Sequence, residues 1–217
     1  MKVRSLNELQ DKLQEDLAWR RREFTTLKFM VSESRKHQKD VLLRSSIALL
    51  YSHWEGHIKH CALVYICYLK QLAPKYKNMQ DNFFQLSLGN KFNQGFSIKK
   101  FPSQKEIFDY ISSGLEENFD VNETVVIDTE SNLKYAVIYN ILSQLGLDTS
   151  VFELKENFID SKLLKCRNSI AHGDKVGAQE LLETYNELEA ELLEMITTFQ
   201  NLVINSAENK SYLKQPD

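Results

Sequence analysis

The sequence is poor in glycine, proline and cysteine. Its 217 residues include only 7 glycines, 3 prolines and 3 cysteines. So few turn-forming residues exclude a many-stranded sandwich or barrel and favour long, uninterrupted helices. The cysteines, Cys61, Cys67 and Cys166, are odd in number and form no C-x-x-C pair, so we expect free thiols rather than a disulfide or zinc framework. These absences predict an all-α fold.

A strong net charge and a long apolar run are also missing. The 27 basic and 30 acidic side chains give a formal net charge of −3, which excludes a strongly basic nucleic-acid coat and an acidic tail protein. The most hydrophobic stretch, residues 61–69, is too short to span a bilayer. No basic segment followed by an apolar run opens the sequence. We therefore expect a cytoplasmic protein without membrane contacts.

Apolar residues recur at three- and four-residue steps, the spacing of amphipathic helices. The pattern predicts helices over residues 5–34, 39–72, 131–145, 156–171 and 177–203. Pro74, Gly146 and Gly173 supply stop signals for three of them. We expect residues 1–204 to form one helical domain and residues 205–217 to form a frayed polar tail.

The final helix carries a heptad pattern. Its apolar residues follow steps of four and three: Leu181, Tyr185, Leu188, Leu192, Met195, Phe199 and Leu202. Such a seam packs against neighbouring helices, so we assign it to the inside of a helical bundle.

Residues 70–130 differ from the flanking helices and are interpreted as an insertion. Residues 70–105, called here the lysine-rich tract, hold seven lysines and one acid, Asp81, interleaved with phenylalanines. Residues 106–130 hold eight acids and no base, with a possible short strand at 123–127 because valine and isoleucine are β-branched. The length of the tract favours local helices over a bare loop.

The most informative local pattern is Arg167-Asn168-Ser169-Ile170-Ala171-His172-Gly173-Asp174. A guanidinium binds phosphate in a bidentate manner, and an imidazole moves protons near neutral pH. Positions five apart on a helix lie ~140° out of register, so Arg167 and His172 share a face only if a break at 171–173 swings the imidazole back. Otherwise Arg167 is a solvated helix residue and His172 is a C-terminal cap that suits the helix dipole.

This run closely resembles the R-x(4–6)-H motif of the HEPN superfamily (higher eukaryotes and prokaryotes nucleotide-binding). Arg167, Asn168 and His172 match its three marked positions. The run from Tyr51 to Gly56 looks like that of compact stand-alone bacterial members predicted to be toxins or defence ribonucleases. The resemblance covers roughly residues 38–72 and 130–203, and it implies a bundle of long antiparallel helices that dimerises around a composite cleft.

The resemblance also implies an activity, a metal-independent endoribonuclease in a toxin–antitoxin or anti-phage setting. By analogy, His172 would activate or position the ribose 2′-OH, Arg167 would hold the phosphate, and Asn168 would orient one of them. The products would be a 2′,3′-cyclic phosphate and a 5′-OH, with RNA as substrate, no cofactor, and a cognate antitoxin or defence protein as a further partner. Two alternatives remain open: a non-catalytic HEPN module that binds RNA, a nucleotide or a partner protein, and a purely structural helical adaptor.

Glu55 is the second candidate at the active site. It projects ~100° from Trp54, off the apolar wedge of its helix. A carboxylate there would tether an arginine or histidine of a neighbouring helix and fix the catalytic geometry. The alternatives are a solvent-exposed glutamate or a local contact with Arg44. Gly56 beside it costs helix stability, which indicates a close helix approach or a dimer contact.

Two further patterns are weaker candidates for binding. Histidines 53, 57 and 60 form a stripe on one helix, but no acid or cysteine has matching spacing, so we expect surface or boundary residues and no metal. The lysine-rich tract would guide single-stranded RNA, because lysines neutralise phosphates and aromatic rings stack on bases. Its candidate RNA-binding residues are Lys91, Lys99, Lys100 and Lys105. Alternatively, its phenylalanines pack under the insertion and its lysines keep it soluble.

Overall fold

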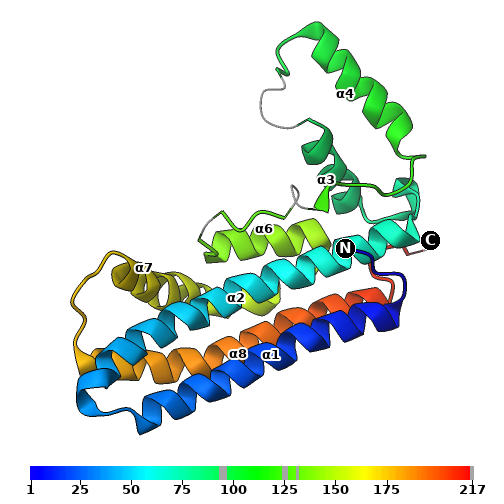
Figure 1. Cartoon of the computed structure of the whole chain (residues 1–217). Coiled ribbons are helices and arrows are strands. Elements are labelled where there is room, and N and C mark those ends of the chain that lie inside the picture. Colours follow the sequence, from blue (N-terminus) through cyan, green and yellow to red (C-terminus); the bar gives the residue numbers. More distant parts are fainter. Residues whose placement is uncertain (93–96, 124–126, 131, 216–217) are drawn as a thin grey trace.

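Three long helices form the body of the protein. A computed structural model describes residues 1–92, 97–123, 127–130 and 132–215. In it α1 (Leu6–Glu33) runs antiparallel to α2 (Lys36–Leu72), and α8 (Ala178–Glu208) packs against both (Figure 1). The described residues contain two isolated β-bridges and no strand, which confirms the all-α prediction. No helix within these ranges combines the length and hydrophobicity needed to cross a bilayer.

Shorter elements connect and cover the long helices. They are η1 (Tyr76–Asn78), α3 (Asp81–Lys91), α4 (Phe101–Gly114), α6 (Tyr135–Leu145), η2 (Ser150–Lys155), η3 (Phe158–Leu164) and α7 (Lys165–Ala171). The five helices expected from periodicity are all present, although α6 begins four residues later than expected. The helix expected over 156–171 is wound as a π-helix through η3 before it continues as α7. The central residues of the strand expected at 123–127 lie outside the described residues.

Helix α2 lies at the centre of the core. Helices α1, α7 and α8 all pack on it, so it needs apolar residues on most of its sides. The heptad seam of α8 is buried from Leu181 to Phe199 and half-buried at Leu202, as its spacing predicts. At the C-terminal end of α2, Ala73 adopts a left-handed conformation (φ 46°) just before Pro74. The Ala73 N–H donates a hydrogen bond to Leu69 O. The stop signals at Pro74 and Gly146 (φ 65°) both end helices.

The C-terminal residues differ from the frayed tail expected for 205–217. Helix α8 continues to Glu208, and Tyr212 behind it is only 5% exposed. Gln80 N donates to Tyr212 O at 2.9 Å, and Lys214 N donates to Asn78 O at 2.9 Å. The described part of this segment, up to residue 215, is therefore packed against η1 and α3, because one tyrosine provides an anchor that the polar composition hides.

The insertion forms the local helices α3 and α4, as its length predicts. Helix α3 lies beside the C-terminal end of α2, and α4 projects away from the bundle there (Figure 1). Several lysines of the tract pair with acids from residues 106–130. Lys75 and Lys77 both contact Glu116, and Lys70 lies 2.9 Å from Glu123. The basic residues of the tract and the acidic residues of 106–130 thus partly neutralise each other's charge.

A charged network is buried between α1 and α2. Arg20, 6% exposed, donates from Nε to Asp16 Oδ2 (2.7 Å) and from Nη1 to His53 O (3.1 Å). His57 Nδ1 lies 2.6 Å from the same Asp16 oxygen. A Cβ on Gly56 would lie 3.2 Å from both Arg20 Nη atoms, so the glycine permits the close helix approach that was one of its two expected roles. His53 and His57 are thus buried here rather than at the surface.

Burial and hydrogen bonding set the protonation of this network. Burial alone would raise the pKa of Asp16, but hydrogen bonds from His57 and Arg20 outweigh it and lower that pKa. Burial lowers the pKa of His57 and raises that of the Cys61 thiol, so both are neutral. We infer that His57 donates from Nδ1 to Asp16 and accepts at Nε2 from Cys61 Sγ at 3.2 Å.

Candidate active site

The R-x(4–6)-H motif lies on α7, a short helix that packs on α2. It follows directly from the π-helical η3, a conformation often found near functional sites. In η3, Asp160 Oδ1 accepts a hydrogen bond from Tyr135 N at 2.8 Å. This bond joins the start of α6 to η3, the element that leads into α7.

Arg167 is half-buried and is held by three groups. Its Nη1 donates to Asn168 Oδ1 at 2.8 Å and to Asn132 Oδ1 at 3.1 Å. Its guanidinium carbon lies 4.8 Å from the centroid of the Tyr51 ring on α2. No acidic side chain of the described residues pairs with it. The guanidinium is therefore oriented without being neutralised, as a group that receives an anion requires.

His172 lies at the C-terminal end of the same helix and is exposed. Its backbone is still helical (φ −83°, ψ −3°), and its N–H bonds Asn168 O at 2.9 Å. The chain turns only at Gly173 (φ 79°), so the imidazole is not swung back toward Arg167. Across the described residues, no hydrogen bond or ion pair joins the two side chains. Because the backbone stays helical from Arg167 to His172, the two side chains leave α7 ~140° apart around its axis.

The loop after His172 is fixed from α2. Arg44 donates from Nη1 to Asp174 O at 2.7 Å and from Nη2 to Val176 O at 3.3 Å. These bonds hold the C-terminal end of α7 in place. They also show that Arg44 binds this loop and is not the local partner of Glu55.

Glu55 is half-buried, and no hydrogen bond or ion pair among residues 1–92, 97–123, 127–130 and 132–215 joins it to an arginine or a histidine. Its Oε1 accepts from Thr129 Oγ1 at 2.8 Å, in the connection that precedes α6. One turn earlier on α2, the Tyr51 hydroxyl accepts from Leu133 N at 2.7 Å. Burial, and then the nearby Glu55 carboxylate, raise the pKa of Tyr51 to about 12. The expected direct tether is therefore wrong in form, because Glu55 bonds Thr129 and its carboxylate acts on Tyr51, whose ring contacts Arg167.

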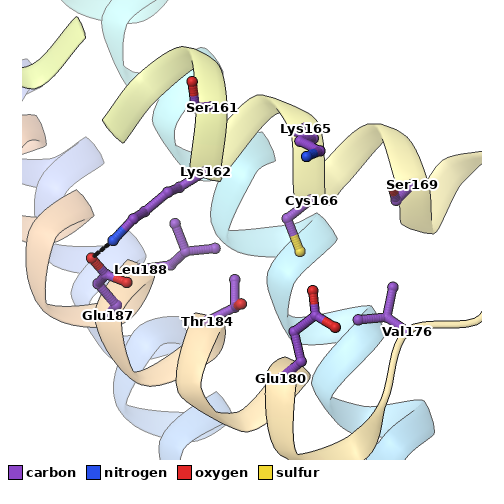
Figure 2. A pocket seen from close by; sticks show the side chains of 10 residues that line it. All are labelled: Ser161, Lys162, Lys165, Cys166, Ser169, Val176, Glu180, Thr184, Glu187 and Leu188. Atoms are coloured by element: carbon purple, nitrogen blue, oxygen red, sulfur yellow. Dashed lines mark hydrogen bonds and ion pairs between the residues drawn. The ribbon is translucent and has the colours of Figure 1, made fainter. Parts of the chain in front are cut away.

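A small pocket of about 230 Å³ lies on the opposite face of α7, toward α8 (Figure 2). Its lining residues are Ser161, Lys162, Lys165, Cys166, Ser169, Val176, Glu180, Thr184, Glu187 and Leu188. An ion pair between Lys162 and Glu187 lies at one end. Burial, and then Glu180, raise the pKa of Cys166, so its thiol is protonated. Ser169 of the motif lines the pocket, but Arg167 and His172 are not among its lining residues.

The lysine-rich tract is divided by the structure into an inner and an outer part. Phe83 is buried, and the Lys91 ammonium lies 4.4 Å from the Tyr110 ring centroid. By contrast, Phe101 is 78% exposed, and Phe108, just after the tract, is 69% exposed. The other three candidate lysines are exposed beside them: Lys99, Lys100 and Lys105. Phe83 is thus packed as the second alternative predicts, and the RNA-binding role of the exposed lysines stays a prediction.

The outer part of the tract is remote from Arg167 within one protomer. Helix α2 rises ~30 Å between Tyr51, which contacts Arg167, and Leu72, near the insertion. Helix α4 lies beyond that end (Figure 1). An RNA that touched both surfaces of one subunit would have to span this distance.

The fold and the motif together define a protein of the HEPN superfamily. They combine a bundle of long helices with an arginine and a histidine at the end of a short helix. The RiboL-PSP-HEPN family model matches residues 15–205, so the chain belongs to that family. No curated protein and no solved structure gives a significant match. Membership of the superfamily indicates a nuclease or another RNA-related role.

Sequence reasoning identified Arg167, Asn168, His172 and Glu55 but missed the residues that connect them. Within the described residues, Arg167 bonds Asn168 and contacts Tyr51, Glu55 bonds Thr129, and no hydrogen bond from the His172 side chain joins these groups. The missed members are Tyr51 as a contact of Arg167, together with Asn132, Leu133 and Thr129. The one available signal was the i, i+4 spacing of Tyr51 and Glu55, which places them on one face of α2.

Proposed function

We propose that this protein is a homodimeric, metal-independent endoribonuclease of the cytoplasm, acting in a toxin–antitoxin or anti-phage setting. The observation that carries the proposal is the state of Arg167. Its guanidinium is oriented by two amide oxygens and an aromatic ring and remains free of any described acidic partner. It shares a helix of seven residues with Asn168, and His172 follows at the end of that helix.

The proposed reaction is an internal transesterification. His172 removes the proton of a ribose 2′-OH, and the 2′ oxygen forms a bond to the adjacent phosphorus. The bond from phosphorus to the 5′ oxygen breaks, and the leaving oxygen takes up a proton from the second motif of the dimer. Arg167 stabilises the negative charge that grows on the phosphate. The products are a 2′,3′-cyclic phosphate and a 5′-OH, and DNA is not a substrate because it lacks the 2′-OH.

The geometry of one protomer also supports a second candidate function. Because Arg167 and His172 leave α7 ~140° apart and no hydrogen bond or ion pair of the described residues joins them, a single subunit provides a phosphate-binding group without a bonded base. A non-catalytic module that binds RNA, a nucleotide or a partner protein would need only the arginine. Formation of a composite cleft by two copies is what separates the nuclease from this alternative.

Purified wild-type protein is expected to cleave single-stranded RNA in the presence of EDTA and to leave a DNA of the same sequence intact. His172→Ala should reduce the cleavage rate by about 10²–10⁴-fold, the usual contribution of a general base. The products should carry 2′,3′-cyclic phosphate ends, measured by mass spectrometry. Because His172 is exposed, its loss should leave the melting temperature unchanged. RNA that is bound but not cut by the wild type would favour the non-catalytic module.

We also propose that Lys91, Lys99, Lys100 and Lys105 contact RNA, Lys91 from its position over Tyr110. Charge reversal of Lys99 and Lys100 to glutamate is expected to weaken RNA binding and to flatten its salt dependence, because phosphate contacts release counterions. Binding is measured by fluorescence anisotropy at salt concentrations from about 50 to about 300 mM. The slope of log K against log salt should change by ~0.7 for each lost phosphate contact. Lys36→Glu, on the exposed start of α2, is the matched control. Unchanged binding by the double variant would remove the tract from the proposal.

A further inference from the structure

Arg167 has one edge occupied and one edge open. Both described amide contacts, from Asn132 and Asn168, involve the single nitrogen Nη1. Because that nitrogen carries two N–H groups, the two contacts use both of them. No hydrogen bond within the described ranges uses Nε or Nη2. Those two nitrogens form the edge of a guanidinium that binds two phosphate oxygens in parallel.

The partners on the occupied edge are uncharged, which matters for binding. An acid in the position of Asn132 would hold the guanidinium equally well but would cancel its charge. An amide oxygen orients the group and leaves the full positive charge for a ligand. The Tyr51 ring adds a face contact at 4.8 Å, which limits rotation of the guanidinium plane.

Asn132 is itself positioned from α2. The N–H of its neighbour Leu133 donates to the Tyr51 hydroxyl at 2.7 Å, so one tyrosine contacts the guanidinium with its ring and the backbone beside Asn132 with its oxygen. Glu55, one turn along α2, accepts from Thr129 in the same connection at 2.8 Å. Helix α2 thus holds the connection at two points, and that connection presents Asn132 to Arg167.

We propose that Asn132 and Tyr51 are positioning residues, which fix Arg167 with its Nε–Nη2 edge open and its charge uncompensated to receive a phosphate of single-stranded RNA. Glu55 supports them through Thr129. The inference rests on the proposed function for the identity of the ligand. It adds a requirement that the motif does not contain, namely a neutral hydrogen-bond acceptor in the connection before α6.

The test replaces Asn132 with aspartate or alanine in a His172→Ala background, where bound RNA is not cleaved. Asn132→Asp keeps the shape of the side chain but places a carboxylate on Arg167. The slope of log K against log salt for a single-stranded RNA should therefore fall by ~0.7, the value for one lost phosphate contact. Asn132→Ala adds no charge and should keep the wild-type slope. Asn140→Asp, which adds the same charge at an exposed position of α6, is the matched control and should also keep it.

The cleavage rate and the melting temperature provide a second measurement. With His172 intact, Asn132→Asp is expected to lower the rate by about 10²-fold, as does loss of a transition-state donor, with a smaller loss in Asn132→Ala. Tyr51→Phe, which keeps the ring, should retain more activity than Tyr51→Leu. An unchanged salt slope in Asn132→Asp, or equal rate losses that follow the melting temperatures, would overturn the inference. A wild type that binds RNA without cutting it would overturn the nuclease alone, whereas absence of RNA binding would overturn both.

Discussion

Substitution of Arg167 by lysine is expected to lower RNA cleavage by about 10²–10³-fold, although the formal charge is kept. Lysine carries a point charge and cannot present two parallel N–H groups to a phosphate. It also cannot bond both Asn132 and Asn168 while it stacks on Tyr51, the three contacts that orient the guanidinium. The measurement is the single-turnover rate with saturating enzyme, which reports the chemical step rather than RNA binding.

A matched control for this substitution is available on α1. Arg22 is exposed on α1, outside the elements that hold Arg167, so Arg22→Lys should keep the wild-type rate. The thermal unfolding of both variants separates a lost contact from a lost fold. An Arg167→Lys variant that retains activity within about threefold would show that bidentate contact is not used in the transition state. Arg167 would then act only through its charge.

The fold was largely predictable because its dominant signal is local. Apolar spacing along α1, α2 and α8 defines which face of each helix is buried, and a bundle is the simplest way to cover those faces. The π-helical η3 has only seven residues, so its wider turns are too few to appear as a period in the sequence. The packing of residues 205–215 depends on Tyr212 meeting η1 and α3, a contact between distant segments that no local pattern encodes.

The same distinction between local and distant contacts applies to the site. Arg167, Asn168 and His172 lie within six positions, so their motif is visible in the sequence. Asn132 reaches Arg167 from 35 residues away, in a connection without periodicity, and it therefore has no sequence signature. Glu55 was found as a candidate, but its partner was not, because a carboxylate that faces a neighbouring element does not specify which residue it meets.

The buried network between α1 and α2 gives the largest expected effect on stability. Arg20→Ala should lower the free energy of unfolding by about 3–5 kcal/mol, the cost of leaving one charge of a buried pair uncompensated. The side chains of Arg20 and Asp16 are only 7% and 10% exposed, so water cannot take over the role of the guanidinium. His57 would still donate to Asp16, but burial lowers the pKa of that imidazole and keeps it neutral. The measurement is urea unfolding at pH 7, followed by circular dichroism.

A double-mutant cycle tests whether the cost comes from the orphaned carboxylate. If it does, Asp16→Ala combined with Arg20→Ala should be less destabilising than the sum of the two single changes, because the double variant buries no unpaired charge. Arg22→Ala, two positions along the same helix and exposed, should stay within about 0.5 kcal/mol of the wild type. Strict additivity of the two changes would instead assign the stabilisation to packing of the arginine stem against α2. In that case Gly56 would be needed only to leave space for the Arg20 side chain. Gly56→Ala should then cost little stability in a variant in which Arg20 is shortened.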